Sequence, residues 1–343
     1  MHRYVIVLFF LVTVGPAFSQ NTNSSSLKLL SSRITRGLSE PRKKLDAIFY
    51  WVTDNIEYDV AIYSKWLSGH NMYEDFDLNY RDSIEYNEAV ANVVANRKKA
   101  VCDGYARLFK SLCNHAGIPC EVVNGMAKGV INDELQPHAW NAVRLSGKWY
   151  LIDPTWASGH VTDTFTKELD MFYYLTPPEK MFLNHLPDEQ KWTLLDKSFN
   201  AERFSQSPVA NIEVIKNGLI DYYPKTKTIM LRPGESATVW LLFDKSPSDL
   251  DIEISAKGWP ETRASRLNIE LTEKVADSLY RIDPDYFKEI EKIQIVSKKV
   301  IQNKVEFVIK PLTDIKGIQI HVDYGFPALV YETSTAKKGV IIH

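Results

Sequence analysis

The sequence predicts an α+β fold in which helices pack on an antiparallel sheet, followed by a second unit built from strands. Before about residue 118, apolar residues recur at helical spacing, whereas three apolar runs between residues 120 and 153 are separated by turn residues. After about residue 204 the chain changes to short alternating runs, which are typical of a β-sandwich. We therefore expect one domain over residues 29–204 and an immunoglobulin-like β-rich domain over residues 205–343.

The N-terminal residues predict export. Residues 1–19 combine a basic start, an apolar run from Val5 to Val14 and small residues before Gln20, which are the three parts of a secretory signal peptide. The apolar run is too short to span a bilayer, and no later stretch is long enough. We expect a periplasmic or secreted protein without an integral membrane segment after cleavage, and a flexible polar leader over residues 20–28.

Charge and cysteine content narrow the function classes. The chain has 41 Lys and Arg against 43 Asp and Glu, a balance that creates no field for gathering nucleic acid, so nucleic-acid partners are not expected. The three cysteines are Cys102, Cys113 and Cys120, and an odd count leaves at least one thiol unpaired. Cys113 and Cys120 lie in apolar patterns typical of buried residues. A disulfide between them stays open, since export permits one.

Helical patterns dominate the first third of the chain. A cap followed by Pro41 starts a helix whose apolar residues keep helical spacing to about Asn55. Residues 58–86 are rich in Tyr, Asp and Asn, which predicts a long loop with one short helix, its aromatic residues packing over a site. Helical patterns begin again at Asn87 and at Cys102, and the second ends at a Gly-Ile-Pro turn.

Strand patterns follow. We expect strands over residues 120–126, 138–145 and 149–153, with a tight Ser146-Gly147 turn between the last two, and short helices within residues 160–204 near 168–173 and 178–184. The strands expected in the C-terminal domain are Ile212–Ile215, Thr228–Leu231, Ala237–Phe243, Leu250–Ser255, Leu267–Leu271, Val305–Ile309 and Ile318–Val322.

Three short segments, 101–105, 137–141 and 151–156, hold polar residues where packing alone would not place them. The first puts Cys102 at the start of a predicted helix, where unpaired backbone N–H groups and the helix dipole favour a thiolate. A neighbouring imidazolium would favour the thiolate further, which makes His138 a candidate base.

Hairpin geometry predicts how the other two segments meet. If Leu145 pairs with Lys148 across the turn, Trp140 opposes Asp153, and His138 becomes a diagonal neighbour of Asp153 on the same face. An imidazole and a carboxylate can bridge the roughly 7–8 Å between such backbone positions, and the carboxylate would fix the tautomer of the ring. A β-bulge in the hairpin would instead turn Asp153 to the opposite face.

Other interpretations exist for each residue. A helix-start cysteine can be structural, a histidine before a strand can be a satisfied core or surface residue, and an Asp-Pro pair commonly begins a turn. His160 is an alternative base. A metal site is not expected, because Cys102, His138 and Asp153 offer only three ligands and the chain has no CxxC or HExxH pattern.

Taken together, the segments resemble the transglutaminase-like superfamily. Its C-[DE]-G-[YF]-A, H-A-W-N and D-P-T-W patterns match residues 102–106, 138–141 and 153–156 in the same order. The resemblance covers roughly residues 40–160. Residues 173–195 are also similar to the kyphoscoliosis-peptidase and cytokinesis-protein branch of this superfamily.

The resemblance implies a papain-type core with Cys102 as nucleophile, His138 as base and Asp153 as the acid that orients the base, without a cofactor. It also implies an oxyanion-hole side chain upstream of Cys102, beside the backbone N–H of Cys102 itself. The candidate oxyanion or cleft side chains are Tyr58, Trp66, Asn96 and Trp140.

The implied chemistry is attack on a carboxamide or peptide bond of a protein or peptide, through a thioester. Transfer of the acyl group to an amine gives an acyltransferase, and transfer to water gives a deamidase or protease. The alternative is a catalytically silent transglutaminase-like module that binds a protein in the same cleft, because a fold does not by itself carry a function.

Overall fold

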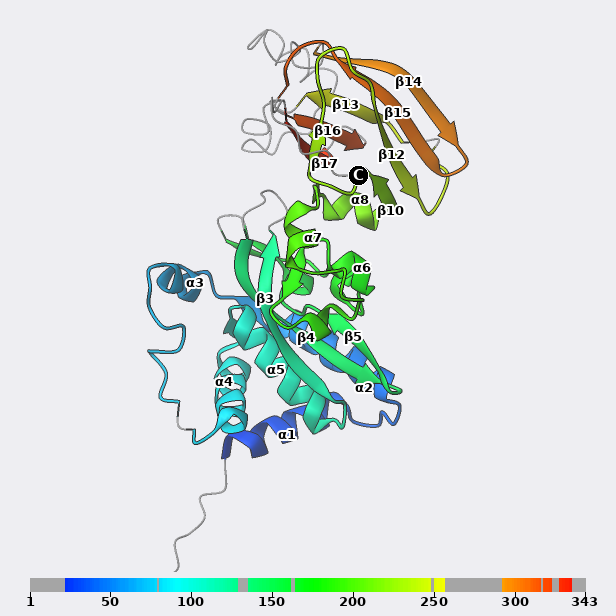
Figure 1. The fold of residues 1–343 in the computed structure, drawn as a ribbon. Coiled ribbons are helices and arrows are strands. Elements are labelled where there is room, and N and C mark those ends of the chain that lie inside the picture. Colours follow the sequence, from blue (N-terminus) through cyan, green and yellow to red (C-terminus); the bar gives the residue numbers. More distant parts are fainter. Residues whose placement is uncertain are drawn as a thin grey trace, which may run out of the picture.

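The computed structural model describes residues 22–78, 80–128, 135–161, 164–247, 250–256, 292–315, 317–322 and 327–334. The expected signal peptide and the expected strand Leu267–Leu271 lie outside these residues. Within the described residues, no helix combines the length and apolar character that crossing a membrane requires. Helices come first in the chain and strands dominate its C-terminal part (Figure 1), so the α+β fold is confirmed.

Four helices contribute buried apolar side chains to the hydrophobic core of the N-terminal part of the chain. They are α1 (Thr22–Ile34), α2 (Pro41–Asn55), α4 (Ser83–Arg97) and α5 (Cys102–His115). The expected leader is wrong from Thr22 onward, where α1 begins. Leu27 is buried and the Ser31 hydroxyl donates to the carbonyl of Leu112 at 2.8 Å, which ties α1 to α5.

The expected loop contains one short helix, α3 (Val60–Leu67), whose start is capped by the carboxylate of Asp59. Helix α4 begins before the predicted Asn87 because Asp82 accepts hydrogen bonds from two backbone N–H groups of its first turn. Strand β1 (Glu57–Tyr58) pairs in parallel with β2 (Lys99–Ala100), which brings Tyr58 beside the residues that lead into α5.

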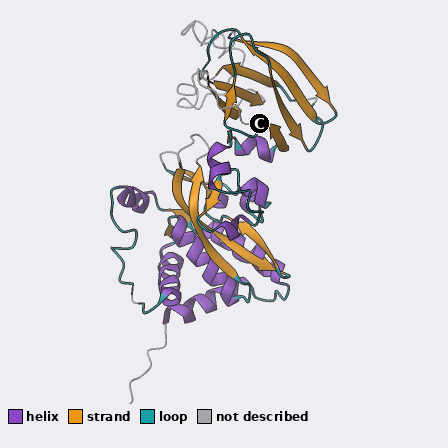
Figure 2. Cartoon of the chain, viewed as in Figure 1, coloured by secondary structure: helices purple, strands orange, loops and turns teal. Residues whose placement is uncertain are grey.

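An antiparallel sheet with strand order β5-β4-β3-β8 packs against α5. Figure 2 shows the strands of this part of the chain in orange beside the purple helices. Its strands are β3 (Cys120–Lys128), β4 (Leu135–Leu145), β5 (Lys148–Ile152) and β8 (His185–Pro187). Leu145 pairs with Lys148, and the register continues without a shift to Asn141 and Ile152. The predicted hairpin register is therefore confirmed.

Short elements join this sheet to the C-terminal strands. They are η1 (Trp156–Ser158), β6 (Gly159–Val161), β7 (Phe165–Lys167), η2 (Met171–Tyr173), α6 (Pro178–Met181), η3 (Gln190–Thr193) and α7 (Ala201–Gln206). Elements η2 and α6 confirm the two short helices that the sequence predicts.

The C-terminal strands form two sheets. One contains β10 (Leu219–Tyr223), β12 (Ala237–Phe243), β15 (Lys304–Pro311) and β14 (Ile293–Ile301) in that order. The other contains β11 (Thr228–Met230), β17 (Pro327–Ser334), β16 (Gly317–Val322) and β13 (Ile252–Ala256), with β9 (Val209–Ala210) also on β17. Buried apolar side chains of both sheets, such as Phe307 and Ile320, provide a sandwich-like core.

The strand expected at Ile212–Ile215 is wrong, because these residues form helix α8 (Ile212–Lys216). The Asn211 side chain caps it by accepting from the backbone N–H of Glu213 at 2.9 Å. Its three buried apolar residues fit either a short strand or a single helical turn. The division of the chain near residue 204 stays a prediction.

Candidate active site

Cys102 is the first residue of α5, where its half-buried side chain faces a cleft. The same first turn of the helix packs closely against α4 and β2. A Cβ at Gly104 would lie 2.7 Å from Ala100 Cβ and 2.9 Å from Val94 Cγ2, so only glycine permits this approach. The close packing fixes the end of the helix that carries the thiol.

His138 on β4 and Asp153 just after β5 meet on one face of the sheet, as the hairpin register requires. His138 Nε2 lies 2.7 Å from Asp153 Oδ2. The other carboxylate oxygen accepts the backbone N–H groups of Thr155 at 2.8 Å and Trp156 at 3.1 Å. Asp153 is fully buried, so its orientation is set by these partners rather than by water.

The buried pair favours the charged forms of both groups. Burial alone would lower the pKa of His138, but the charge and hydrogen bond of Asp153, together with those of Cys102, raise it to about 10. Burial would raise the pKa of Asp153, but the charge of His138 and hydrogen bonds from two histidines hold it below its usual range. At neutral pH the site therefore favours the imidazolium form of His138. Its Nε2–H donates to Asp153, which leaves its Nδ1–H available to the sulfur of Cys102.

The second histidine is His185, the first residue of β8, for which the sequence predicted no role. Its Nε2 lies 3.2 Å from Asp153 Oδ2, and its Nδ1 lies 2.6 Å from Asn184 Oδ1. Burial lowers the pKa of His185 to about 4, against the raising effect of Asp153. The sequence holds no local signal for this contact, because it depends on β8 joining the sheet beside β3.

The cleft above Cys102 has a volume of about 1600 Å³. Aromatic residues of β1 and α3 line it next to the thiol: ring centroids are 5.9 Å apart for Tyr58 and Tyr63, and 5.9 Å for Tyr63 and Trp66. The loop aromatics thus pack over the site, as the sequence predicts. A cleft of this size can hold an extended peptide segment rather than only a small molecule.

The candidate oxyanion and cleft residues do not all meet at the thiol. Tyr58 and Trp66 line the cleft, and burial together with the charge at Cys102 raises the pKa of Tyr58. Asn96 is exposed on α4 and does not line the cleft, so it is wrong as a candidate. Trp140 is buried behind His138, with ring centroids 6.0 Å apart, and does not line the cleft either.

Two further features bear on the chemistry. His160, the alternative base, sits exposed at the edge of the cleft and pairs with Glu168 at 3.3 Å, so the structure favours His138.

Ligand atoms of His138, Asp153 and His185 lie within 4.8 Å of one another, close enough for a metal. A metal there would have to replace both N–H···O hydrogen bonds to Asp153, and the hydrogen-bonded arrangement suits acid–base chemistry instead.

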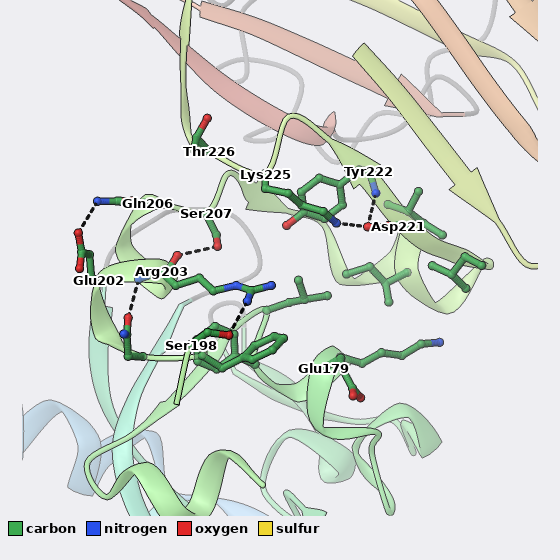
Figure 3. Close-up of a pocket in the computed structure, with 18 residues that line it drawn as sticks. Glu179, Ser198, Glu202, Arg203, Gln206, Ser207, Asp221, Tyr222, Lys225 and Thr226 are labelled. Carbon is green, nitrogen blue, oxygen red and sulfur yellow. Dashed lines mark hydrogen bonds and ion pairs between the residues drawn. The ribbon is translucent and has the colours of Figure 1, made fainter. Parts of the chain in front are cut away.

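A second cavity of about 660 Å³ lies between the α6–α7 segment and the α8–β10 segment (Figure 3). Arg203 donates to Ser198 Oγ at 3.2 Å within it, and Lys225 forms an ion pair with Asp221. None of the residues that line it is a cysteine or a histidine. The cleft at Cys102 is therefore the candidate active site.

Comparison with known proteins agrees with the geometry. Residues 28–154 match the family model of the transglutaminase-like superfamily, and the chain therefore contains a transglutaminase-like domain. Among curated proteins, it is similar to the kyphoscoliosis peptidases of Mus musculus and Homo sapiens, each 31% identical over 227 residues. These alignments cover 64% of this chain and 32% of each relative, so the chain spans about a third of their length.

The chain is also similar, at lower sequence identity, to two further proteins. Hillarin of Drosophila melanogaster is 26% identical over 137 residues, which is 34% of this chain and 17% of hillarin. A crystal structure described as that of a TGase has 21% sequence identity and a TM-score of 0.30, over 44% of this chain and 34% of the other.

Proposed function

We propose that this chain is a thiol-dependent enzyme that forms a thioester with a carboxamide or peptide carbonyl of a protein or peptide. The observation that carries the proposal is Cys102 at a helix start in an open cleft, with His138 held at 2.7 Å by buried Asp153. A helix-start thiol beside an imidazolium is the arrangement that cysteine nucleophiles require.

The reaction follows from the positions of the groups. The Cys102 thiolate attacks the carbonyl carbon and forms a C–S bond, while the backbone N–H of Cys102 and the Tyr58 hydroxyl can stabilise the oxyanion. His138 gives its Nδ1 proton to the departing ammonia or amine, leaving a thioester. A second amine or water then loses a proton to His138 as it attacks the thioester, which restores the thiolate and the imidazolium. Asp153 keeps the ring aligned throughout and exchanges no proton.

The acyl acceptor separates three activities. An amine acceptor gives protein crosslinking, whereas water gives deamidation of a carboxamide or cleavage of a peptide bond. The test is to incubate the full chain with a glutamine-rich unfolded protein and a labelled primary amine, with Cys102→Ala as control. Label incorporation that depends on Cys102 indicates transfer, and ammonia release or cleavage without incorporation indicates hydrolysis.

The alternative is a silent binding module, which the wide aromatic cleft would also suit. Failure of the wild-type chain to act on any substrate, together with a Cys102 that reacts no faster than an ordinary thiol, would favour this alternative. Retained capture of the same protein by wild type and Cys102→Ala would then identify binding as the function.

Export is part of the proposal, supported by the signal-like pattern of residues 1–19. Mass spectrometry of the chain recovered after expression in a bacterium should find a mature N-terminus near Gln20. Recovery of the unprocessed chain from the cytoplasm would contradict it.

A further inference from the structure

Two histidines share one carboxylate oxygen. Asp153 Oδ2 lies 2.7 Å from His138 Nε2 and 3.2 Å from His185 Nε2. An ionised carboxylate can only accept hydrogen bonds, so both Nε2 atoms must carry a hydrogen. His185, which is neutral at neutral pH because burial lowers its pKa to about 4, must then have a bare Nδ1.

The neighbours of His185 can satisfy that tautomer. The Asn184 amide lies between His185 Nδ1, 2.6 Å from its Oδ1, and the Tyr173 hydroxyl, 3.3 Å from its Nδ2. Oxygen and nitrogen of an amide are assigned from the hydrogen bonds around them. A bare Nδ1 needs a donor, so we assign the NH₂ group to His185 and the oxygen to Tyr173, whose hydroxyl donates.

With this assignment every donor in the chain of contacts has an acceptor. Tyr173 donates to Asn184, Asn184 donates to His185, and His185 donates to Asp153. All four side chains are buried, with exposed fractions of 3%, 4%, 1% and 0%. Water therefore has little access to compete for these hydrogen bonds, and each strengthens the constraint on the next.

The fold holds His185 in this position from both sides. Strand β8 approaches β3 so closely that a Cβ on Gly125 would lie 2.2 Å from the carbonyl oxygen of Leu186. The His185 ring is also enclosed by indole rings, with centroids 4.9 Å from Trp140 and 4.6 Å from Trp156. These contacts on the strand and on the ring favour the observed position of the imidazole beside the carboxylate.

We propose that His185 is a positioning residue of the candidate triad, whose Nε2–H fixes the Asp153 carboxylate and so keeps the Nδ1 of His138 directed at Cys102. His185 does not line the cleft and is 1% exposed, so it acts through Asp153 rather than on the substrate. The inference rests on the proposed function, because it assigns His185 a role at the same thiol.

The first test compares His185→Gln, which can keep an N–H donor near the position of Nε2, with His185→Met, which cannot. The matched control is His115→Gln at the other end of α5, where the imidazole pairs with Glu88 at 2.9 Å. The readout is the rate at which iodoacetamide alkylates Cys102 at neutral pH, resolved by peptide mass spectrometry in samples that circular dichroism shows to be folded.

We expect His185→Met to slow this alkylation by about tenfold, within the roughly 30-fold that separates a full thiolate from a thiol of pKa near 8.5 at pH 7, and His185→Gln to stay within about threefold of wild type. His115→Gln should leave the rate unchanged. A folded His185→Met that alkylates like wild type would overturn the proposal, since a purely structural histidine would lower the melting temperature without changing the Cys102 rate.

The second test needs no variant, so it holds even if His185→Met does not fold. Long-range ¹H–¹⁵N spectra of the wild-type chain should show His185 with a protonated Nε2 and a bare Nδ1 at neutral pH. A bare Nε2 would overturn the proposal. If wild-type Cys102 is instead no more reactive than an ordinary thiol, the proposed function fails while the tautomer still tests the His185 network.

Discussion

The two ends of helix α5 carry the same kinds of residue in different surroundings. At the first turn, Cys102 interacts with His138, which pairs with the carboxylate of Asp153 at 2.7 Å. At the last turn, Cys113 is followed by His115, which pairs with Glu88 at 2.9 Å. A cysteine, a histidine and a carboxylate therefore occur at both ends, yet only one end forms a candidate active site.

Solvent access and the direction of the helix separate the two ends. Cys102 faces an open cleft at the positive end of the helix dipole, which favours a thiolate. Cys113 is fully buried, and burial together with the neighbouring Cys120 raises its pKa well above the usual value. Both Cys113 and Cys120 are free thiols. Residue types alone do not define the site; the helix end and the cleft do.

The largest expected effect comes from removing the exposed thiol. Cys102→Ala should reduce acyl transfer or hydrolysis by about 10⁴-fold or more, as the loss of a covalent nucleophile does. Cys113→Ala should leave the rate per folded molecule unchanged, because that thiol does not reach the cleft. Amine incorporation or ammonia release measures both. Equal activity of Cys102→Ala and wild type would contradict the claim that the active site lies at the Cys102 end of α5.

The next largest effect on kcat separates the two carboxylates that pair with these histidines, Asp153 and Glu88. Asp153→Asn should lower kcat by about 10³–10⁴-fold, because the amide favours the wrong tautomer of His138. The matched change Glu88→Gln should leave kcat unaltered, since His115 faces no substrate. Steady-state kinetics of the two folded variants make the comparison. A similar loss in both would show that the substitutions act through stability.

A smaller effect concerns pH and stability at the candidate site. Burial lowers the pKa of His185 to about 4, so the unfolded chain binds a proton more readily, and stability falls as the pH drops from about 6.5 to 4. The groups that face it are Asp153, His138 and Tyr173. Because folding raises the pKa of His138, this residue contributes its full stabilisation of the fold below about pH 6.5. The stabilisation that Asp153 contributes is lost only below about pH 4, and Tyr173 stays neutral over the whole range.

His185→Gln removes that titration. Its free energy of unfolding should therefore fall by roughly 2–3 kcal/mol less than that of wild type between pH 7 and 4. Urea unfolding at both pH values gives the difference. An equal fall in the two proteins would mean that His185 is not a buried neutral ring.

The smallest expected effect lies at the far end of α5. The His115 and Glu88 side chains are partly exposed, at 19% and 12%, so His115→Gln should change stability by about 1 kcal/mol or less. Thermal unfolding followed by circular dichroism measures it. A large loss of activity in this variant would extend the functional region along the helix.

Local sequence predicted the parts of the site that depend on local rules. Alternation of side chains and a two-residue turn were sufficient for the His138–Asp153 contact, and helical spacing placed Cys102 at a helix start. His185 was missed because its role depends on a strand pairing made across 58 residues, between Ala127 and His185. Asn96 was wrong because sequence distance from Cys102 does not show which face of α4 meets the cleft.

The C-terminal part shows the same limit. The strand Ala237–Phe243 has a clear alternation and was predicted with its observed bounds. Residues 212–215 are apolar enough to form either a buried strand or a buried helix. The side chain of Asn211 favours the helix because it caps the first turn. Helix α1 was missed in part because its serine-rich start gives a weak pattern, while burial of Leu27 against the other helices orders it.

The most direct test of the central claim is the pH dependence of iodoacetamide alkylation at each cysteine of the folded wild-type chain, with His138→Gln as reference. An imidazolium-paired thiolate predicts that Cys102 reacts at about pH 6 at least tenfold faster than a free thiol of pKa near 8.5, that His138→Gln loses this advantage, and that Cys113 stays unlabelled. Alkylation of Cys102 that rises only near pH 8.5 and is the same in His138→Gln would contradict the account.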